Sequence, residues 1–360
     1  MGHPIVHVTG ARPNFPKVAP VMSALPDDVE QLLVHTGQHY DEKMSEIFFR
    51  QLGLPEPDLN LEVGSGSHAT QTAAIMVGLE RLFGEREPAL VMVYGDVNST
   101  VAAALVAAKM QIPLAHVEAG LRSFDMTMPE EVNRRLTDQL SELLFVTSPE
   151  AVGHLANEGL DVDRIHFVGN PMIDTLLANL SRFDAERARL AHGLPERYVV
   201  ATLHRPSNVD DPVVAKEIVT ALHEIAEDVD LFIPLHPRGR AVLEEAALRT
   251  HTRVHVEEPV GYVEFISLVR GAVAVLTDSG GVQEETTVLG VPCLTMRPNT
   301  ERPITITHGT NRLVTRANIV ESFREVVDAS RHGRRVPPLW DGKAGERIAD
   351  VVVRWLAERA

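Results

Sequence analysis

Short apolar runs alternate with longer stretches of helical spacing along most of the chain. The runs of the first half lie at residues 4–9, 31–36, 89–94, 113–118, 143–147 and 165–169. Each run ends at Gly or at a polar residue, and its continuous apolar character is typical of a strand covered on both faces. The alternation of such strands with helices predicts βαβ units and parallel sheets.

The pattern begins again after residue 170. The runs of the second series lie at residues 198–204, 231–236, 273–279 and 291–296. Because 360 residues are too many for one ordinary core, we expect an α/β protein of two doubly wound, Rossmann-like lobes with a central cleft. The lobes should span residues 1–170 and 171–340. The last stretch, residues 341–360, has helical apolar spacing and is expected to pack back on the first lobe.

Composition narrows the class of protein. Hydrophobic residues make up 44% of the chain and charged residues 23%, as in soluble globular proteins. No apolar run approaches 18 residues and no basic leader precedes one, so we expect a cytoplasmic protein without a membrane partner. A net charge of −16 opposes binding to nucleic acid. The single cysteine, Cys293, lies in an apolar run and is interpreted as a buried thiol.

Ligands of doubly wound sheets bind outside the carboxyl ends of the strands. After the first strand, Gly10 permits a tight turn, and Arg12 and Lys17 flank the expected start of a helix, where a phosphate can bind. An ordinary turn with solvated cations is the alternative. Gln38 and His39 follow the second strand and can line the same cleft, although a lone His is more often structural.

Residues 63–70 read VGSGSHAT and match the glycine pattern G-x-G-x-x-A. In a dinucleotide-binding fold this pattern usually follows the first strand, a position that Gly10 and Arg12 occupy here. We therefore interpret residues 63–70 as a flexible loop and expect neither a nicotinamide nor a flavin cofactor.

Three carboxylates are expected on one rim of the cleft. Asp96 and Glu118 lie at the carboxyl ends of neighbouring predicted strands, and Glu130 opens a helix directly after Pro129. Carboxylates that share a cleft are candidates for acid and base catalysis. The alternative is that Asp96 and Glu130 only cap helices or stabilise their first turns.

In the second lobe, His204 and Arg205 lie at a strand end, directly before Pro206. His236 follows another strand, where it can face the cleft or satisfy backbone groups. The segment TDSGG provides the strongest phosphate signal of the chain, at Ser279, Gly280 and Gly281. Where a strand turns into a helix, their amide groups can face a diphosphate without interference from Cβ atoms.

About a turn beyond that segment, Glu285 is placed to accept hydrogen bonds from sugar hydroxyls, and Arg297 and Arg302 offer further anion partners. A tight turn followed by a stabilising acidic first turn is the alternative interpretation of Glu285.

The motifs GARPNF..K, TGQH, YGDVNST, HVEAGLRS, PEEVNR, HR, TDSGGVQEE and TERP occur in this order between Gly10 and about Val314. As an ordered set they resemble the non-hydrolysing UDP-N-acetylglucosamine 2-epimerase family. The resemblance implies a GT-B-like pair of lobes, a homodimer, and catalysis without metal or NAD. It also implies that C2 of a UDP-N-acetylhexosamine is inverted by elimination and re-addition of UDP.

Carried over by motif, the resemblance implies site roles for individual residues. Acid, base or substrate-orienting roles fall to Asp96, Glu118, Glu130 and His204. Contacts to UDP fall to Arg12, Phe265, Ser279, Gly280, Gly281, Glu285 and Arg302, with Lys17 nearby.

Two departures from the family pattern leave alternatives open. Pro206 stands where many members have an Arg that belongs to a second, effector site, and Val260 stands where a Gln is common beside the uracil. The sugar can therefore be N-acetylglucosamine or a modified relative such as a diacetamido uronate. A GT-B glycosyltransferase, a hydrolysing epimerase and a non-catalytic UDP-sugar sensor remain rivals.

Overall fold

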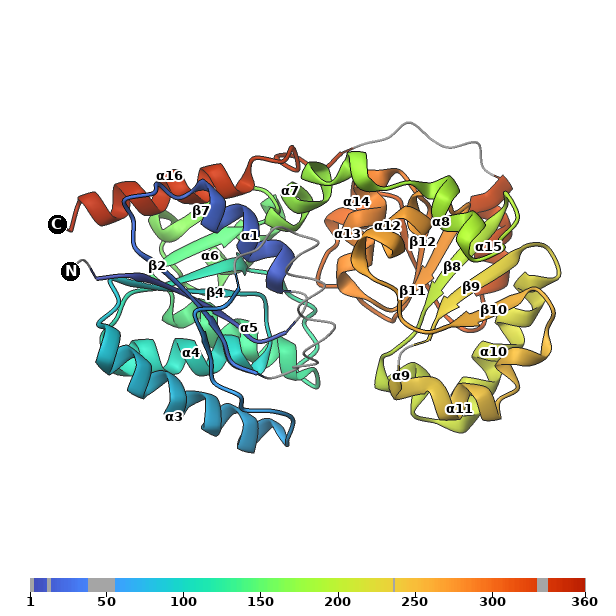
Figure 1. Cartoon of the computed structure of the whole chain (residues 1–360), viewed down its shortest axis with the longest axis horizontal. Coiled ribbons are helices and arrows are strands. Elements are labelled where there is room, and N and C mark those ends of the chain that lie inside the picture. The colour runs from blue at the N-terminus through green and yellow to red at the C-terminus, as the bar shows by residue number, and fades with distance from the viewer. Residues whose placement is uncertain (1–2, 12–13, 38–55, 236, 329–335, 360) are drawn as a thin grey trace. The chain divides into compact units, whose positions relative to one another are not determined.

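The computed structural model describes residues 3–11, 14–37, 56–235, 237–328 and 336–359 (Figure 1). The chain divides into two compact units, each built around its own parallel sheet. Unit 1 comprises Met1–Ala178 and Pro338–Ala360, and unit 2 comprises Asn179–Pro337. The predicted α/β class with two doubly wound sheets is confirmed.

The sheet of unit 1 is parallel throughout its described strands, in the order β3-β2-β1-β4-β5-β6-β7. The strands are β1 (Ile5–Thr9), β2 (Gln31–His35), β3 (Leu59–Asn60), β4 (Leu90–Tyr94), β5 (Leu114–Ala119), β6 (Leu143–Val146) and β7 (Ile165–Phe167). The chain runs outward from β1 in one direction and from β4 in the other, so the order reverses between these two strands.

Helices cover both faces of this sheet. They are α1 (Phe15–Ala24), α3 (His68–Arg86), α4 (Asn98–Lys109), α5 (Pro129–Leu140), α6 (Pro149–Asn157), η2 (Val162–Arg164), α7 (Pro171–Ala178) and α16 (Ala344–Ala357). Alternate residues of β4 show the two layers: Met92 packs with α1 and α16, and Val93 packs with α3 and α4. Ile348 and Val352 of α16 join α1 in one buried cluster, so the last helix belongs to the core of unit 1.

The sheet of unit 2 is also parallel in its described strands, in the order β10-β9-β8-β11-β12-β13. The strands are β8 (Tyr198–Thr202), β9 (Asp230–Pro234), β10 (Val254–Glu257), β11 (Ala274–Thr277), β12 (Cys293–Met296) and β13 (Asn311–Val314). Here the order reverses between β8 and β11.

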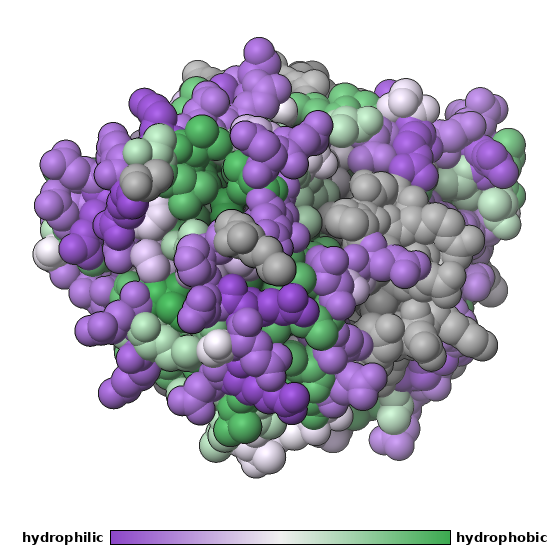
Figure 2. Space-filling model, turned by 60° about the vertical axis from the view of Figure 1, so that its left-hand side comes forward, coloured by the Kyte–Doolittle hydropathy of each residue, from purple (hydrophilic) through white to green (hydrophobic). Residues whose placement is uncertain are grey.

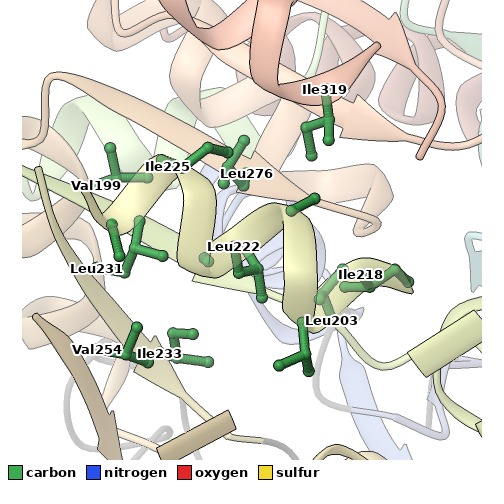
Figure 3. Close-up of a cluster of buried hydrophobic side chains, with 14 of the residues drawn as sticks. Val199, Leu203, Ile218, Leu222, Ile225, Leu231, Ile233, Val254, Leu276 and Ile319 are labelled. Atoms are coloured by element: carbon green, nitrogen blue, oxygen red, sulfur yellow. The ribbon is translucent and has the colours of Figure 1, made fainter. Parts of the chain in front are cut away.

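The helices of unit 2 are η3 (Leu180–Arg182), α8 (Ala185–Ala191), α9 (Pro206–Val209), α10 (Pro212–Ala226), η4 (Pro237–Gly239), α11 (Arg240–Glu245), η5 (Leu248–Thr250), α12 (Tyr262–Gly271), α13 (Gly280–Leu289), α14 (Ile304–Thr307) and α15 (Ile319–Asp328). Ile218, Leu222 and Ile225 of α10 pack on Val199 and Leu276 of the sheet (Figure 3). The apolar residues of α12 cover the opposite face.

The strand predictions differ from the structure in two ways. All ten predicted strands are present with ends shifted by at most two residues, because a buried run often continues into the loop beyond the last ladder pair. Strands β3, β10 and β13 were not predicted. Val254–Glu257 alternates apolar and polar residues and Asn311–Val314 begins with two polar residues, so neither has the continuous apolar run of a central strand.

The face of the molecule shown in Figure 2 is mostly hydrophilic, with hydrophobic residues in separate groups. Such scattered apolar residues are normal on a protein surface. Within the described part of the chain, none of the helices has the length and apolar character that a bilayer span requires.

Candidate functional site

Three of the predicted site residues follow strands at the switch points of the two sheets, where the strand order reverses. Asp96 follows β4 in unit 1. In unit 2, His204 follows β8 and Ser279 follows β11. Ligands of doubly wound sheets bind at these points, so each unit presents candidate groups at the edge where its fold favours binding.

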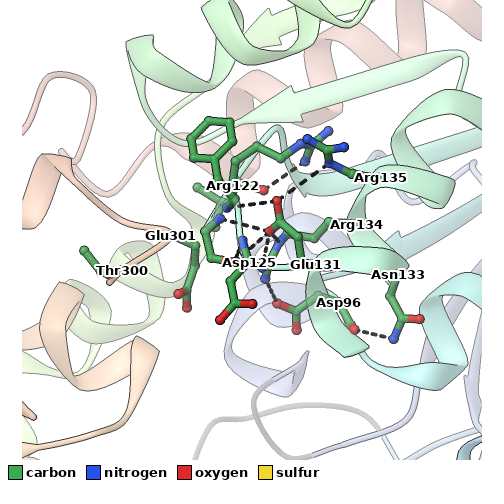
Figure 4. Close-up of polar contacts among 12 residues, drawn as sticks. Asp96, Arg122, Asp125, Glu131, Asn133, Arg134, Arg135, Thr300 and Glu301 are labelled. Atoms are coloured by element: carbon green, nitrogen blue, oxygen red, sulfur yellow. Dashed lines mark hydrogen bonds and ion pairs between the residues drawn. The ribbon is translucent and has the colours of Figure 1, made fainter. Parts of the chain in front are cut away.

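Asp96 is held by Arg134, a buried residue of α5 (Figure 4). The same guanidinium binds Glu131, with Nη2 2.7 Å from Oε2. Glu131 also accepts a hydrogen bond from the backbone amide of Ser123 at 2.9 Å. Burial acts to raise the pKa of Glu131, but the bonds from Arg134 and Ser123 outweigh it and hold the pKa below its ordinary value. Arg134 therefore links Asp96 to the buried, ionised carboxylate of Glu131.

Glu118 forms a buried ion pair with Lys17 from α1. Its backbone has a φ of 76°, in the left-handed region that side chains rarely adopt, and the register of β5 against β6 shifts at this point. A bulge of this kind changes the direction of a side chain at the end of a strand. Glu118 is therefore turned toward Lys17 by an irregularity that the apolar pattern does not reveal.

Gly95 brings these groups together. Its φ is 67°, and a Cβ added to it would lie 3.2 Å from both Glu118 Oε2 and Lys17 Nζ. Since Asp96 is the next residue, the end of β4 places Asp96 beside the ion pair of Glu118 and Lys17. The ion pair of Glu118 and Lys17 thus lies against the residue that directly precedes Asp96, at the ends of the neighbouring strands β4 and β5.

Glu130 differs from Glu131, its neighbour in the first turn of α5. Glu130 is partly exposed and makes no hydrogen bond or ion pair with another described residue, whereas Glu131 is fully buried in the network around Arg134. Pro129 at the helix start and the two acids after it suit a helix N-terminus. Of the pair, Glu130 is the carboxylate that remains open to a ligand.

In unit 2, Asp278 orients His204. Its Oδ1 lies 2.8 Å from Nδ1 of His204, and its Oδ2 accepts the backbone amides of His204 at 3.0 Å and Arg205 at 2.9 Å. Burial acts to raise the pKa of Asp278, but the bonds and charge of His204 and the amide of Arg205 lower it overall. An ionised Asp278 thereby fixes the plane of an imidazole that is 41% exposed.

A pocket of about 200 Å³ lies beside His204. It is lined by Thr202, Leu203, His204, Pro234, Pro259, Val260, Phe265, Ser279 and Val282. Three predicted site residues, His204, Phe265 and Ser279, therefore share one pocket within unit 2. Ser279 is the N-cap of α13 and its side chain caps no amide of that helix, which leaves the helix start available to an anion.

Arg302 lies against the glycine turn, where a Cβ added to Gly280 would come within 2.6 Å of its Nη1. Its guanidinium is buried and already pairs with Glu301, and with Glu284 at 3.1 Å. Arg205 also has a partner within the protein, since its Nε donates to the backbone oxygen of Asp278 at 2.9 Å. Arg205 and Arg302 are thus held in place by the protein's own acceptors.

Glu285 is buried on α13, and burial raises its pKa to about 8. The charge of Glu284 raises the pKa further, while the interaction with the Tyr262 hydroxyl lowers it. At neutral pH this carboxyl is therefore mainly protonated.

Four predicted site residues fall outside the described residues: Arg12, Gln38, His39 and His236. Residues 63–67 precede α3 and residues 68–70 form its first turn, which Ser67 caps by accepting the amide of Thr70 at 3.2 Å. This loop follows the edge strand β3, away from the point where the strand order reverses.

Sequence reasoning missed the residues that position the others. Arg134, Glu131, Asp278 and Tyr262 were not singled out, although the first three lie within motifs that were. The i, i+3 spacing of Glu131 and Arg134 was the available signal, because this spacing places two side chains on one helix face.

The chain is similar to known proteins over nearly its whole length. The family model described as UDP-N-acetylglucosamine 2-epimerase matches residues 24–353. The UDP-N-acetylglucosamine 2-epimerase of Methanocaldococcus jannaschii is 40% identical over 96% of this chain and 97% of its own. The UDP-2,3-diacetamido-2,3-dideoxy-D-glucuronate 2-epimerase of Pseudomonas aeruginosa is 44% identical over 97% of this chain and 99% of its own.

Solved structures agree with these sequence relatives. The crystal structure of the Methanocaldococcus jannaschii enzyme in complex with UDP-GlcNAc and UDP has a TM-score of 0.90 at 40% identity, and the match covers 97% of this chain and 99% of that one. The Neisseria meningitidis enzyme bound to UDP-GlcNAc has a TM-score of 0.87 at 28% identity, covering 98% and 99%. This chain belongs to the UDP-N-acetylglucosamine 2-epimerase family.

Proposed function

We propose that this protein inverts C2 of a UDP-N-acetylhexosamine, interconverting UDP-GlcNAc and UDP-ManNAc without hydrolysis. Membership of the 2-epimerase family supports the reaction type. The observation that carries the proposal within this chain is the placement of two carboxylates, Asp96 and Glu118, at the ends of the neighbouring strands β4 and β5, with Glu118 against the backbone of Gly95. A nucleotide-binding lobe alone would not need them, whereas proton transfer at a sugar carbon does.

The proton at C2 is very weakly acidic because no carbonyl is adjacent, so direct inversion would pass through a poor carbanion. Elimination avoids that intermediate. A carboxylate removes the C2 proton, the C–H electron pair forms the C1–C2 double bond, and the C1–O bond breaks as UDP leaves with its electron pair. UDP then adds back at C1 while a proton arrives at C2 from the opposite face. We propose Asp96, Glu118 and Glu130 as the proton-handling groups.

We propose that unit 2 binds the UDP portion. The start of α13 at Ser279, Gly280 and Gly281 suits a diphosphate, because its amides and helix dipole stabilise the charge that develops on the leaving group. His204, oriented by Asp278, is suited to bind or protonate the diphosphate. Phe265 and Val260 line the pocket beside it.

Other residues complete the proposed site. Glu285 would receive hydroxyls of the ribose, and Arg205 and Arg302 would add positive charge. Arg12, Lys17, Gln38, His39 and His236 are assigned to substrate binding by their motifs alone. We further propose that the protein forms a homodimer, as the family resemblance implies, and that it acts in the cytoplasm.

A modified sugar is the second candidate substrate. The 44% identity to the Pseudomonas aeruginosa enzyme named for UDP-2,3-diacetamido-2,3-dideoxy-D-glucuronate favours it. The same elimination and re-addition would serve either substrate, because the chemistry occurs at C1 and C2.

Proton NMR of the purified protein with each sugar nucleotide tests the proposal. We expect the manno epimer to appear from one of them, and deuterium at C2 of the recovered sugar when the reaction is run in D₂O. Conversion without deuterium would exclude proton transfer at C2. UDP release that depends on an added acceptor would instead identify a glycosyltransferase, and binding without conversion of either sugar would identify a sensor.

A further inference from the structure

His116 is a fully buried residue in the middle of β5, and both of its ring nitrogens face acceptors. Nδ1 lies 2.6 Å from Oδ1 of Asp138 on α5, and Nε2 lies 2.8 Å from the backbone oxygen of Gly95 at the end of β4. A neutral imidazole has one donor and one acceptor nitrogen. Asp138 also pairs with Arg122, as expected of an ionised carboxylate that accepts from Nδ1. Only the doubly protonated ring can then donate to both partners, and the geometry points to a buried imidazolium.

The surrounding charges can hold such a cation. The second oxygen of Asp138 lies 2.7 Å from Nη1 of Arg122, whose Nη2 lies 2.6 Å from Glu158. The two carboxylates of Asp138 and Glu158 therefore balance the charges of the Arg122 guanidinium and the imidazolium. Arg135, whose side chain is 40% exposed, reaches Glu158 only at 3.7 Å. A buried cation is tolerated where it is paired and fully hydrogen bonded.

The imidazolium joins the two strand ends that carry the acidic residues. Its bond to Gly95 holds the residue directly before Asp96. Asp138, bound to the other side of the ring, accepts the backbone amide of Gly120 at 3.1 Å, two residues after Glu118. Gly95, Glu118 and Gly120 all have a φ between 67° and 76°. Glycine adopts this region freely, so of the three only the left-handed backbone of Glu118 needs surrounding contacts to hold it.

We infer that His116 is a positioning residue of the acidic site: its imidazolium, paired with Asp138, fixes the turns that set the directions of the Asp96 and Glu118 carboxylates. Its role in turnover rests on the proposed epimerase function, whereas its protonation state does not. Its ring nitrogens bond Asp138 and the backbone oxygen of Gly95, and it acts through these two groups.

His7 supplies a matched control. It is a fully buried histidine of the adjacent part of the same sheet, with Nδ1 2.7 Å from the Tyr94 hydroxyl and Nε2 3.1 Å from Gln31 Oε1. A hydroxyl can donate, so a neutral ring satisfies both contacts. Burial lowers the pKa of His7 to about 4, which makes it a neutral reference for the same NMR experiment.

The first test is nitrogen NMR of the full-length protein labelled with [¹⁵N]histidine, at neutral pH. We expect both ring nitrogens of His116 to resonate as protonated nitrogens, and His7 to show the unequal pair of a neutral ring. Asp138→Asn assigns the signal and tests the pairing. Removing the counter-charge should convert His116 to a neutral tautomer, and a neutral His116 in the parent protein or an unchanged spectrum in the variant would overturn the inference.

The second test compares His116→Gln with His7→Gln in the epimerisation assay. We expect turnover of His116→Gln to fall about 10- to 100-fold, from the loss of charged hydrogen bonds, with UDP affinity changed less than about twofold. His7→Gln should keep turnover within about twofold. Equal losses in both variants would show that any buried histidine of this sheet matters equally, and would overturn the positioning role. Absence of turnover in the parent protein would refute the proposed function, while the NMR result would still decide the charge state.

Discussion

The buried carboxyl of Glu285 makes the stability of unit 2 depend on pH in an unusual direction. Burial raises its pKa to about 8, from 4.5 in an exposed chain, and neighbouring Glu284 adds to the effect. The folded protein therefore keeps a proton on Glu285 that the unfolded chain has already lost over most of the range between these values. The contribution of Glu285 to the free energy of unfolding is fully present below about pH 4.5 and is lost as the pH rises toward 8.

The magnitude follows from the width of this window. For each pH unit between the pKa of Glu285 in the unfolded chain and its pKa in the folded protein, the free energy of unfolding falls by about 1.4 kcal/mol. Between pH 5 and pH 8 the free energy of unfolding should therefore fall by about 3 kcal/mol on account of Glu285 alone.

Glu285→Gln isolates this contribution. The amide has nearly the same volume, its oxygen can accept from the Tyr262 hydroxyl, and it does not titrate. We expect the difference in free energy of unfolding, variant minus parent, to increase by about 3 kcal/mol from pH 5 to pH 8. Urea denaturation followed by circular dichroism measures this difference. Glu196→Gln, the same substitution at an exposed position, should change stability by less than about 0.5 kcal/mol at both pH values.

A flat difference, within about 1 kcal/mol from pH 5 to pH 8, would refute the reasoning, because it would mean that Glu285 is ionised in the folded protein. Under the proposed function there is a second consequence. If ribose hydroxyls donate to Glu285, the carboxylate form binds better, so UDP should release a proton near pH 7. Calorimetry in buffers of different ionisation enthalpy measures this release, and Glu285→Gln should abolish it.

Three further predictions follow from single contacts. Gly95→Ala should lower turnover about 100-fold, because its Cβ would push Glu118 aside; native activity would mean that the acidic pair is not needed in this arrangement. Asp278→Asn should lower turnover about 10- to 100-fold and the free energy of unfolding by about 1.5 to 3 kcal/mol, because His204 and two amides lose a charged acceptor; a loss of stability alone would refute the orienting role. Cys293 is fully buried and burial raises its pKa to about 11, so a thiol reagent should modify it only in urea, and rapid labelling of the folded protein would contradict its burial.

The fold was predictable where burial is two-sided. Strands such as Leu90–Tyr94 are covered by helices on both faces, and this produces the uninterrupted apolar runs that the sequence displays. Edge strands such as β10 and β13 are covered on fewer sides and therefore contain polar residues. These polar residues interrupt the apolar run by which a strand is recognised in the sequence. The restart of the pattern in the second half indicated a second sheet, but the helix boundaries depend on caps and turns that propensity does not resolve.

The sequence predicted which candidate site residues lie at the ends of strands. It did not predict which other side chains would bind and orient them. Asp96, Glu118 and His204 were found because they follow buried runs. Arg134 and Asp278, which hold two of these side chains, act through contacts between residues 38 and 74 positions apart. The left-handed backbone of Glu118 likewise depends on the register between neighbouring strands, which no local sequence pattern specifies.

The return of α16 to unit 1 has a consequence for biosynthesis. The apolar side of α1, with Phe15, Val18 and Val21, is completed by Ile348 and Val352. A ribosome must therefore translate every residue of unit 2 before the first helix can acquire its final neighbours. Until then the apolar side of α1 stays exposed to solvent in the emerging chain. We expect chaperones to bind this exposed apolar surface during synthesis.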